Sequence, residues 1–338
     1  MGGISFGARV LPDTLTETAG YKAGLALSLE ALLDHVSGSR YVDIVRQSEE
    51  HAVRLRAEEF EEIFYLLMHR IGFTETLFNG DTTGAYRFHK YRKLGKSEEF
   101  AAVMKIILEE WPKAMEQALA EGSKSWDPRP MLRRAFAEHG RFGVEVVSEQ
   151  LDVIERSSTL NPHTLGRAVE WREALPLEHL FRGNNTEPQI GAFIDQRFID
   201  YLQANPGKLA EMHWREFEKL AAEFYDRQGY KVDLGPGSGD DGVDVRVWKE
   251  GAPQHTPLCI IQCKRQKDKI EKVIVKGLAA DVQYEQAEYG VLVTTSELAP
   301  GARAVITTRG YPIKEVNKEK LAEWLAKLRS SGTGIIRR

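Results

Sequence analysis

The sequence predicts two regions of different fold class: a mainly α-helical N-terminal domain, residues 1–206, and a C-terminal α/β domain, residues 207–338. Long stretches before residue 205 repeat apolar residues at helical spacing. After residue 207, short apolar runs of strand length alternate with helical segments, which is typical of an α/β domain. Asn205-Pro206-Gly207 separates the two patterns, so we place the break there, with residues 183–188 as the alternative.

The length and composition are those of a globular protein with a sizeable core. The chain has no run of about eighteen apolar residues, so we expect no transmembrane helix and no membrane partner. The first residues lack the features of a signal peptide, and we expect a cytoplasmic location. Cys259 and Cys263 lie too far apart along one predicted strand to pair, so they are expected to be small buried thiols facing the core.

The net charge of -4 conceals a small asymmetry. From Gly207 onward, 22 Lys and Arg stand against 19 Asp and Glu, whereas the residues before it hold 24 against 31. The C-terminal part is therefore mildly basic. This balance suits a protein that binds nucleic acid, but it does not by itself indicate one.

The N-terminal part is expected to be a succession of helices. Helical spacing of apolar residues or helix end signals are found along most of it. The expected helices cover residues 20–36, one or two helices within 41–73, then 97–121, 128–139, 144–156, 165–174 and 188–204. Residues 78–84 have the composition of a turn.

Residues 86–96 interleave basic and aromatic side chains and allow two interpretations. Basic groups such as Arg92 and Lys93 could neutralise phosphates while the rings stack on bases. Alternatively, the stretch is a solvated loop or edge strand whose aromatic residues fill the local core. We favour the second interpretation, because short basic patches arise often by chance.

The candidate active-site residues come from three segments of the C-terminal part. A predicted helix, residues 214–225, carries Glu218 at the edge of its apolar stripe. A glycine-rich turn then runs into a strand at 243–247, where Asp244 faces away from the valines. On the next strand, 259–264, successive side chains alternate, so Gln262 and Lys264 share one face.

These four side chains have the chemistry that phosphodiester hydrolysis requires. Carboxylate and amide oxygens bind a hard cation such as Mg²⁺, with Mn²⁺ as a possible substitute. The metal polarises a phosphoryl oxygen and lowers the pKa of a bound water. Lys264 would orient or deprotonate that water, or stabilise charge on the phosphate. The set therefore predicts a metal site at Glu218, Asp244 and Gln262.

The region from about Glu211 to Leu328 resembles the Mrr-type restriction endonuclease domain, a branch of the PD-(D/E)xK nuclease superfamily. The matching pieces are Phe217-Glu218, residues 240–244, Gln262-Cys263-Lys264 and the later strand at 289–296. The resemblance implies a mixed central sheet flanked by helices and magnesium-dependent cleavage of DNA. It also implies that Asp244, Gln262 and Lys264 are central. Gln262 stands where the commonest form of the motif has an acid.

The surrounding residues have more ordinary interpretations as well. Asp240 and Asp241 are expected to be turn residues or to support the metal ligands indirectly. The run after the catalytic lysine contains Arg265, Lys267 and Lys269, which are either solvated or in contact with the DNA backbone. Thr294, Thr295 and Ser296 either cap the next helix or contact DNA, and we favour capping because Ser and Thr are good N-caps.

The favoured hypothesis is a metal-dependent DNA endonuclease, and analogy of fold suggests a restriction or anti-phage defence effector. Its N-terminal domain would select the substrate, sense a signal, or bind a protein partner or a second copy. One alternative is a catalytically weak or inactive nuclease fold that binds DNA without cutting it. Another is a nuclease that acts on RNA or branched DNA, since a centre that hydrolyses the backbone meets phosphate in each.

Overall fold

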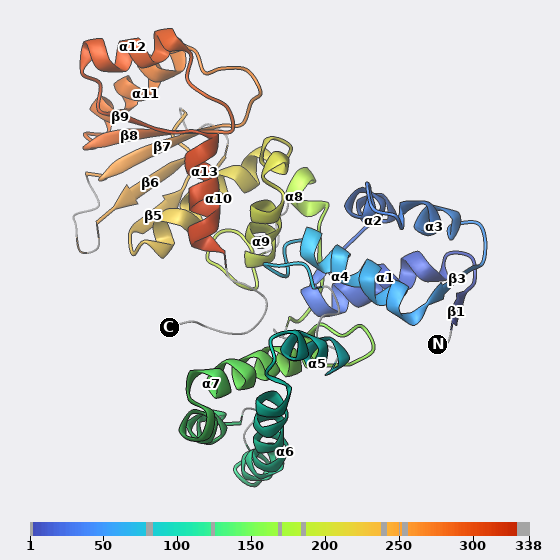
Figure 1. The fold of residues 1–338 in the computed structure, drawn as a ribbon. Coiled ribbons are helices and arrows are strands. Elements are labelled where there is room, and N and C mark those ends of the chain that lie inside the picture. Colours follow the sequence, from blue (N-terminus) through green and yellow to red (C-terminus); the bar gives the residue numbers. More distant parts are fainter. Residues whose placement is uncertain are drawn as a thin grey trace. The chain divides into compact units, whose positions relative to one another are not determined.

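The computed structural model describes residues 3–78, 84–122, 126–167, 171–183, 187–237, 242–249, 251 and 256–329. The chain, drawn in Figure 1, divides into two compact units. The first unit holds residues 1–57, 66–76 and 169–338, and the second holds 58–65 and 77–168. The break predicted at residues 205–207 falls within the first unit, so a separate domain over 1–206 remains a proposal.

A five-stranded sheet forms the centre of the C-terminal part. Its strands run in the order β5-β6-β7-β8-β9. The neighbouring pairs β5-β6 and β6-β7 are antiparallel, whereas β7-β8 and β8-β9 are parallel. The sheet is therefore mixed, which confirms the expected fold class. The strand bounds are β5 Lys231–Leu234, β6 Val245–Trp248, β7 Cys259–Lys264, β8 Tyr289–Thr294 and β9 Ile313–Val316.

Helices cover both faces of this sheet (Figure 1). On one face, Ile260 and Leu292 of the sheet pack in one cluster with α11. On the other face, Tyr225 of α10 hydrogen-bonds Cys259, the strand neighbour of Ile260. Phe224 of α10 stacks on Trp324 of α13, with ring centroids 3.9 Å apart. The helix bounds are α10 Trp214–Arg227, α11 Lys272–Tyr284, α12 Pro300–Arg309 and α13 Lys318–Leu328.

The N-terminal segment of the first unit is mainly helical, but one of the predicted helices is interrupted. The helix expected over 20–36 is wrong at its centre, because Gly24 ends α1 with φ 69° and a short strand follows. Within 41–73, where one or two helices are expected, the structure has two, α3 and α4, separated by β3, which pairs with β1 at the start of the chain. The elements are β1 Gly3–Phe6, α1 Val10–Ala23, β2 Leu25–Ala26, α2 Leu29–Val36, α3 Val42–Gln47, β3 Val53–Arg56 and α4 Ala57–Arg70.

The segment before the nuclease-like sheet is also less helical than expected. The helix predicted over 165–174 is wrong, since its described residues are not helical and β4 follows, paired with β2. The helix predicted over 188–204 begins only at Gln196, because Asp195 caps it by accepting from the Arg197 N–H at 3.1 Å. The elements are β4 Leu175–Pro176, α8 His179–Arg182, α9 Gln196–Ala204 and the 3₁₀ helix η1 Pro206–Ala210.

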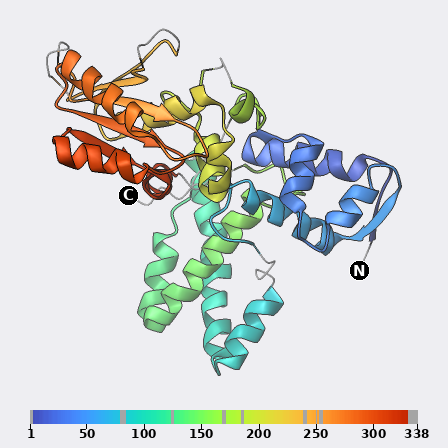
Figure 2. The same ribbon diagram turned by 90° about the horizontal axis from the view of Figure 1, so that it is seen from above.

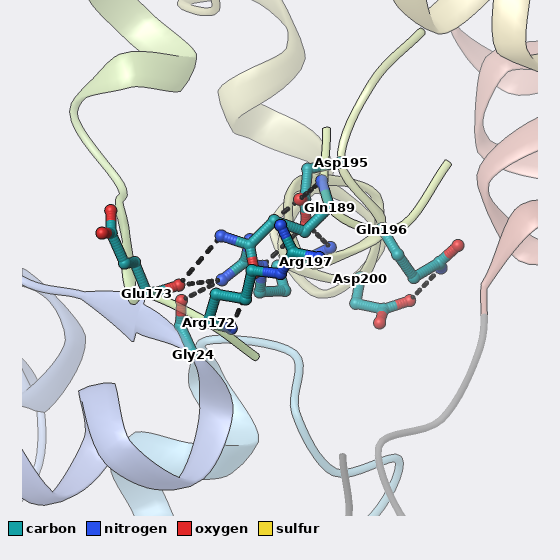
Figure 3. A network of polar contacts seen from close by, with 8 residues as sticks. All are labelled: Gly24, Arg172, Glu173, Gln189, Asp195, Gln196, Arg197 and Asp200. Carbon is teal, nitrogen blue, oxygen red and sulfur yellow. Dashed lines mark hydrogen bonds and ion pairs between the residues drawn. The ribbon is translucent and has the colours of Figure 1, made fainter. Parts of the chain in front are cut away.

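The buried Arg197 of α9 connects the end of α1 with the segment that precedes β4 (Figure 3). Arg197 pairs with Asp195, and both side chains are almost fully buried. Its guanidinium also donates to the carbonyl oxygens of Gly24 at 2.8 Å and Glu173 at 3.0 Å. Because this charge is paired and hydrogen-bonded, its burial is tolerated, whereas loss of one partner would be costly.

The second unit contains long helices, of which α6 and α7 lie side by side (Figures 1 and 2). The helix α6, Ser97–Ala120, confirms the prediction for 97–121. The two helices predicted over 128–139 and 144–156 both exist, within α7, Arg129–Thr159, on either side of a kink at Gly140. The third helix, α5, Gly84–Lys93, packs on them through Tyr91.

The predicted turn at 78–84 lies almost wholly outside the described residues. In the described part of the chain, none of the helices is both long and apolar enough to cross a membrane.

Candidate active site

The helix α10 presents an acidic side chain to the sheet. His213 caps this helix, and its ring accepts a hydrogen bond from the Arg215 N–H at 3.2 Å. The apolar stripe is the predicted one, with Phe217, Leu220, Ala221 and Phe224 buried. Glu218 lies at the same surface and is only 6% exposed. A carboxyl group at this depth requires a partner.

Glu218 has an arginine and a second carboxyl group as partners. Arg215 Nη1 donates to Glu218 Oε2 at 2.8 Å, and Glu218 also shares a side-chain hydrogen bond with Asp244. Burial raises the pKa of Glu218 to about 7, opposed by Arg215 and assisted by the charge of Asp244. A hydrogen bond between two carboxyl groups requires a shared proton, so a cation bound there would relieve their repulsion. Glu218 and Asp244 are called the carboxyl pair below.

Asp244 is held at the point where β6 and β7 begin to separate. Its backbone N–H donates to the Ile261 carbonyl at 2.9 Å, and its own carbonyl accepts from the Gly235 N–H at 2.9 Å. Its side-chain Oδ2 accepts from the Cys263 N–H at 2.6 Å. The carboxylate is therefore fixed on β7 between the two predicted site residues Gln262 and Lys264.

Gln262 is buried beside a glycine. A Cβ atom placed on Gly242 would stand 2.8 Å from Gln262 Nε2, and Gly242 has φ +90°. Glycine therefore suits position 242 because of its backbone conformation, and a side chain there would displace the Gln262 amide. Gln262 is 8% exposed, and its Oε1 has no hydrogen-bond partner among the described residues. A buried acceptor without a donor is costly in a folded protein and suggests an absent ligand.

Lys264 is the last residue of β7 and is half-buried. Alternation along the strand places it on the same face as Gln262 and Ile260, about 7 Å from Gln262 along the backbone. The structure thus brings Glu218 and Asp244 into contact and attaches Asp244 to the backbone between Gln262 and Lys264. No hydrogen bond or ion pair of the Lys264 ammonium group is found within the described ranges.

The two cysteines lie where the strand alternation predicts. Both are free; Cys259 is fully buried, and Cys263 is half-buried. Burial raises the pKa of the Cys259 thiol to about 11. Burial, followed by the charges of Asp244 and Glu218, raises the pKa of Cys263 well above its ordinary value. Neither thiol is a nucleophile at neutral pH.

The basic run after β7 forms a loop, residues 265–269. Two residues directly after β8 hold this loop in place. Thr295 Oγ1 accepts from the Gln266 N–H and donates to the Gln266 carbonyl, each at 3.1 Å, and Ser296 Oγ donates to the Lys267 carbonyl. The prediction that Thr294, Thr295 and Ser296 cap the following helix is therefore wrong, since Ala299 occupies the N-cap of α12. Arg265, Lys267 and Lys269 are exposed on this loop.

Several residues of the site were not predicted. Arg215 lies three residues before Glu218, a helical spacing at which opposite charges meet, and this spacing could have indicated the pair. The roles of Gly242 and of the Cys263 N–H depend on how β6 and β7 pair, so the sequence alone did not indicate them. Asp240 and Asp241 lie outside the described residues. Arg92 and Lys93 are exposed on α5, in the second unit.

The donor set fits a hard divalent cation. Two carboxyl groups and one amide oxygen without a partner are the ligands that Mg²⁺ and similar ions prefer. Within the described residues, no group of three or more His, Cys, Asp and Glu side chains that could hold a metal is found.

Residues 209–325 match the restriction endonuclease family with the Mrr-type catalytic domain. The chain also aligns with the MspJI restriction endonuclease in complex with a 27-mer oligonucleotide, at 17% identity and a TM-score of 0.32. That alignment covers 58% of this chain and 42% of the other, so the chain spans less than half of that protein's length. No curated protein matches the chain.

Proposed function

Since residues 209–325 form an Mrr-type restriction endonuclease domain, we propose that this chain is a divalent-metal-dependent endonuclease that hydrolyses phosphodiester bonds of DNA. The observation that carries the proposal is the carboxyl pair, joined through the Cys263 N–H to the strand that bears Gln262 and Lys264. An ordinary α/β domain has no need to bury two carboxyl groups in contact, or to leave a buried acceptor on the adjoining strand without a donor.

Domains of this family generally use divalent metal ions, and we propose Mg²⁺, with Mn²⁺ as a substitute. Asp244, Glu218 and the Oε1 of Gln262 would hold the ion. When bound, it supplies Lewis-acid chemistry, polarising the scissile phosphate and lowering the pKa of a water molecule. Arg215, which pairs with Glu218, would keep that carboxylate oriented toward Asp244.

Lys264 is assigned to the reacting groups. Its ammonium would hold the charge that develops on the phosphate, or orient the attacking water, from the same strand face as Gln262. Asp240 and Asp241 would support the metal ligands from the adjoining turn. The loop of residues 265–269 would contact phosphates next to the scissile bond through Arg265, Lys267 and Lys269.

The N-terminal residues are proposed to determine which substrate is cut. Residues 1–206 would select the DNA, sense a signal, or bind a protein partner or a second copy of the chain. Restriction of foreign DNA, as an anti-phage effector, is the biological role that the domain type favours. In such a role the protein would act in the cytoplasm, where that DNA enters.

The proposal is tested by cleavage of plasmid DNA with Mg²⁺, using Asp244→Ala and Lys264→Ala. Matched controls are Asp233→Ala and Lys276→Ala, which change exposed residues of the same domain outside the proposed site. Each site variant should lower cleavage by roughly 100-fold or more, whereas the controls should cut as the parent does. Calorimetry should show Mn²⁺ binding to the parent and its loss in Asp244→Ala.

Cleavage that survives in both site variants would refute the assigned site. If the parent binds DNA but neither binds metal nor nicks the plasmid, the domain is a binding module. A substrate panel of duplex, single-stranded and branched DNA and RNA, all with Mg²⁺, tests the choice of DNA. Faster cleavage of RNA would overturn that choice while leaving the metal site in place.

A further inference from the structure

The helix α5 uses its basic residues in two different ways. Arg87 is buried and bonded to α7, donating to Gln150 and to the Val146 carbonyl. Lys90 pairs with Glu149, also of α7, at 2.7 Å. These charges hold α5 on its neighbour, so the interpretation of residues 86–96 as a solvated loop or edge strand is wrong. The Tyr91 ring does fill the local core, as that interpretation expected.

The remaining basic residues of α5 lie on its other side. His89, Arg92 and Lys93, called the α5 basic face, are exposed and share one helical face by their spacing. No hydrogen bond or ion pair of these three side chains is found within the part of the chain that the structure describes. The helix contains no acidic residue. Phe88, which is 46% exposed, adds an apolar ring at the edge of the face.

Several other basic residues of the second unit are neutralised. On α6 and α7, Lys113 pairs with Glu110, and Arg134 pairs with Glu109, Glu110 and Glu138. A solvated helix surface usually mixes both signs in this way. Two adjacent cations without a counter-charge repel each other, and a polyanion in contact with them would relieve that repulsion. The α5 basic face is thus complementary in charge to a nucleic-acid backbone.

We propose that the α5 basic face binds the phosphate backbone of the DNA that the nuclease domain cuts. This inference rests on the proposed function and extends it to the second unit. Arg92 and Lys93 would contact phosphates without reading bases, so that they would contribute to affinity rather than to sequence choice.

The test measures binding of a short fluorescent duplex by anisotropy over a range of salt concentrations. The full chain carrying Asp244→Ala is the parent, so that the DNA stays intact. Arg92→Ala/Lys93→Ala is compared with Lys105→Ala/Lys113→Ala, which removes the same charge from exposed positions on α6 of the same unit. The first pair should weaken binding roughly tenfold and lower the salt slope by about 1–2, and the second pair should change neither. Arg92→Glu/Lys93→Glu should weaken binding further, and circular dichroism checks that each variant is folded.

Equal affinity and equal salt slope for the two double-alanine variants would overturn the inference. Binding of polyglutamate, measured in parallel, separates a second class of partner. If Arg92→Ala/Lys93→Ala lost polyglutamate binding but kept DNA binding, the face would take an acidic protein.

Plasmid cleavage by the unmodified protein separates the proposed nuclease function from the proposed role of the α5 basic face. If it cleaves DNA while the α5 variant binds normally, only this inference fails, whereas a protein that neither binds nor cuts DNA refutes both.

Discussion

At the scale of the residue, Gly242 controls the position of the Gln262 amide, which is proposed to bind the metal. Its φ of +90° belongs to the region that favours glycine, and its missing side chain leaves the space that Gln262 Nε2 occupies. Gly251 has a similar φ of +73°, but no atom of the described residues lies within 4 Å of the Cβ that it lacks. The two glycines therefore separate the cost of backbone strain from the cost of displacing Gln262.

We expect Gly242→Ala to abolish most cleavage and Gly251→Ala to retain it. Both should lower the free energy of unfolding by about 1–2 kcal/mol, since each forces an L-residue into the left-handed region. Only Gly242→Ala also moves the amide that would bind the metal, and it should cost at least roughly tenfold in rate. Plasmid cleavage and urea unfolding measure the two effects, and similar rates for both variants would show that the Gln262 contact has no role in catalysis.

At the scale of the element, α10 is anchored by Glu223, an acidic residue for which the sequence predicted no role. Glu223 is 1% exposed. Its Oε2 accepts from the N–H groups of Ala192, Phe193 and Ile194, and its Oε1 accepts from Arg227 at 2.7 Å. A carboxylate that receives several donors is strongly stabilised, so α10, the helix that carries Glu218, is fixed to the loop just before α9.

We expect Glu223→Ala to lower the free energy of unfolding by about 3 kcal/mol, because buried N–H groups and an arginine lose their acceptor. Glu223→Gln retains one acceptor oxygen and should cost less. The control is Glu178→Ala, which breaks a Glu–Arg pair of the same spacing whose side chains are exposed. That change should cost under about 1 kcal/mol. Urea unfolding measures all three, and equal losses for Glu223→Ala and Glu178→Ala would contradict the anchoring role.

At the scale of the whole molecule, a buried histidine makes stability depend on pH. His35, at the end of α2, is 5% exposed and meets the Tyr201 ring edge-on at 5.5 Å. Burial lowers the pKa of His35 to about 4, with Lys208 and Arg70 acting in the same direction and Asp34 opposing them. The folded state therefore holds the ring neutral, whereas the unfolded chain takes up a proton near pH 6.5.

The folded pKa lies below the unfolded one, so this contribution to stability is complete above about pH 6.5 and is lost as the pH falls toward about 4. Between about pH 7 and about pH 5 the loss should be on the order of 2 kcal/mol. His35→Phe keeps the ring contact and cannot titrate, so it should not show this part of the loss. Urea unfolding at several pH values, with His51→Phe as an exposed control, measures the difference. A parallel pH dependence in the protein and in His35→Phe would disprove the assignment.

The sequence by itself determined the fold class of the C-terminal part and the strand and helix faces on which its four candidate residues lie, because strand alternation and helical spacing are local properties. The alternation placed Gln262 and Lys264 on one face, and the apolar stripe placed Glu218 at its edge. The helix at 97–121 was predicted for the same reason. By contrast, the contact between Glu218 and Asp244, the need for glycine at 242 and the pairing of β1 with β3 join segments that are distant in sequence. Their formation depends on which surfaces meet when the chain packs, and only the tertiary structure decided that.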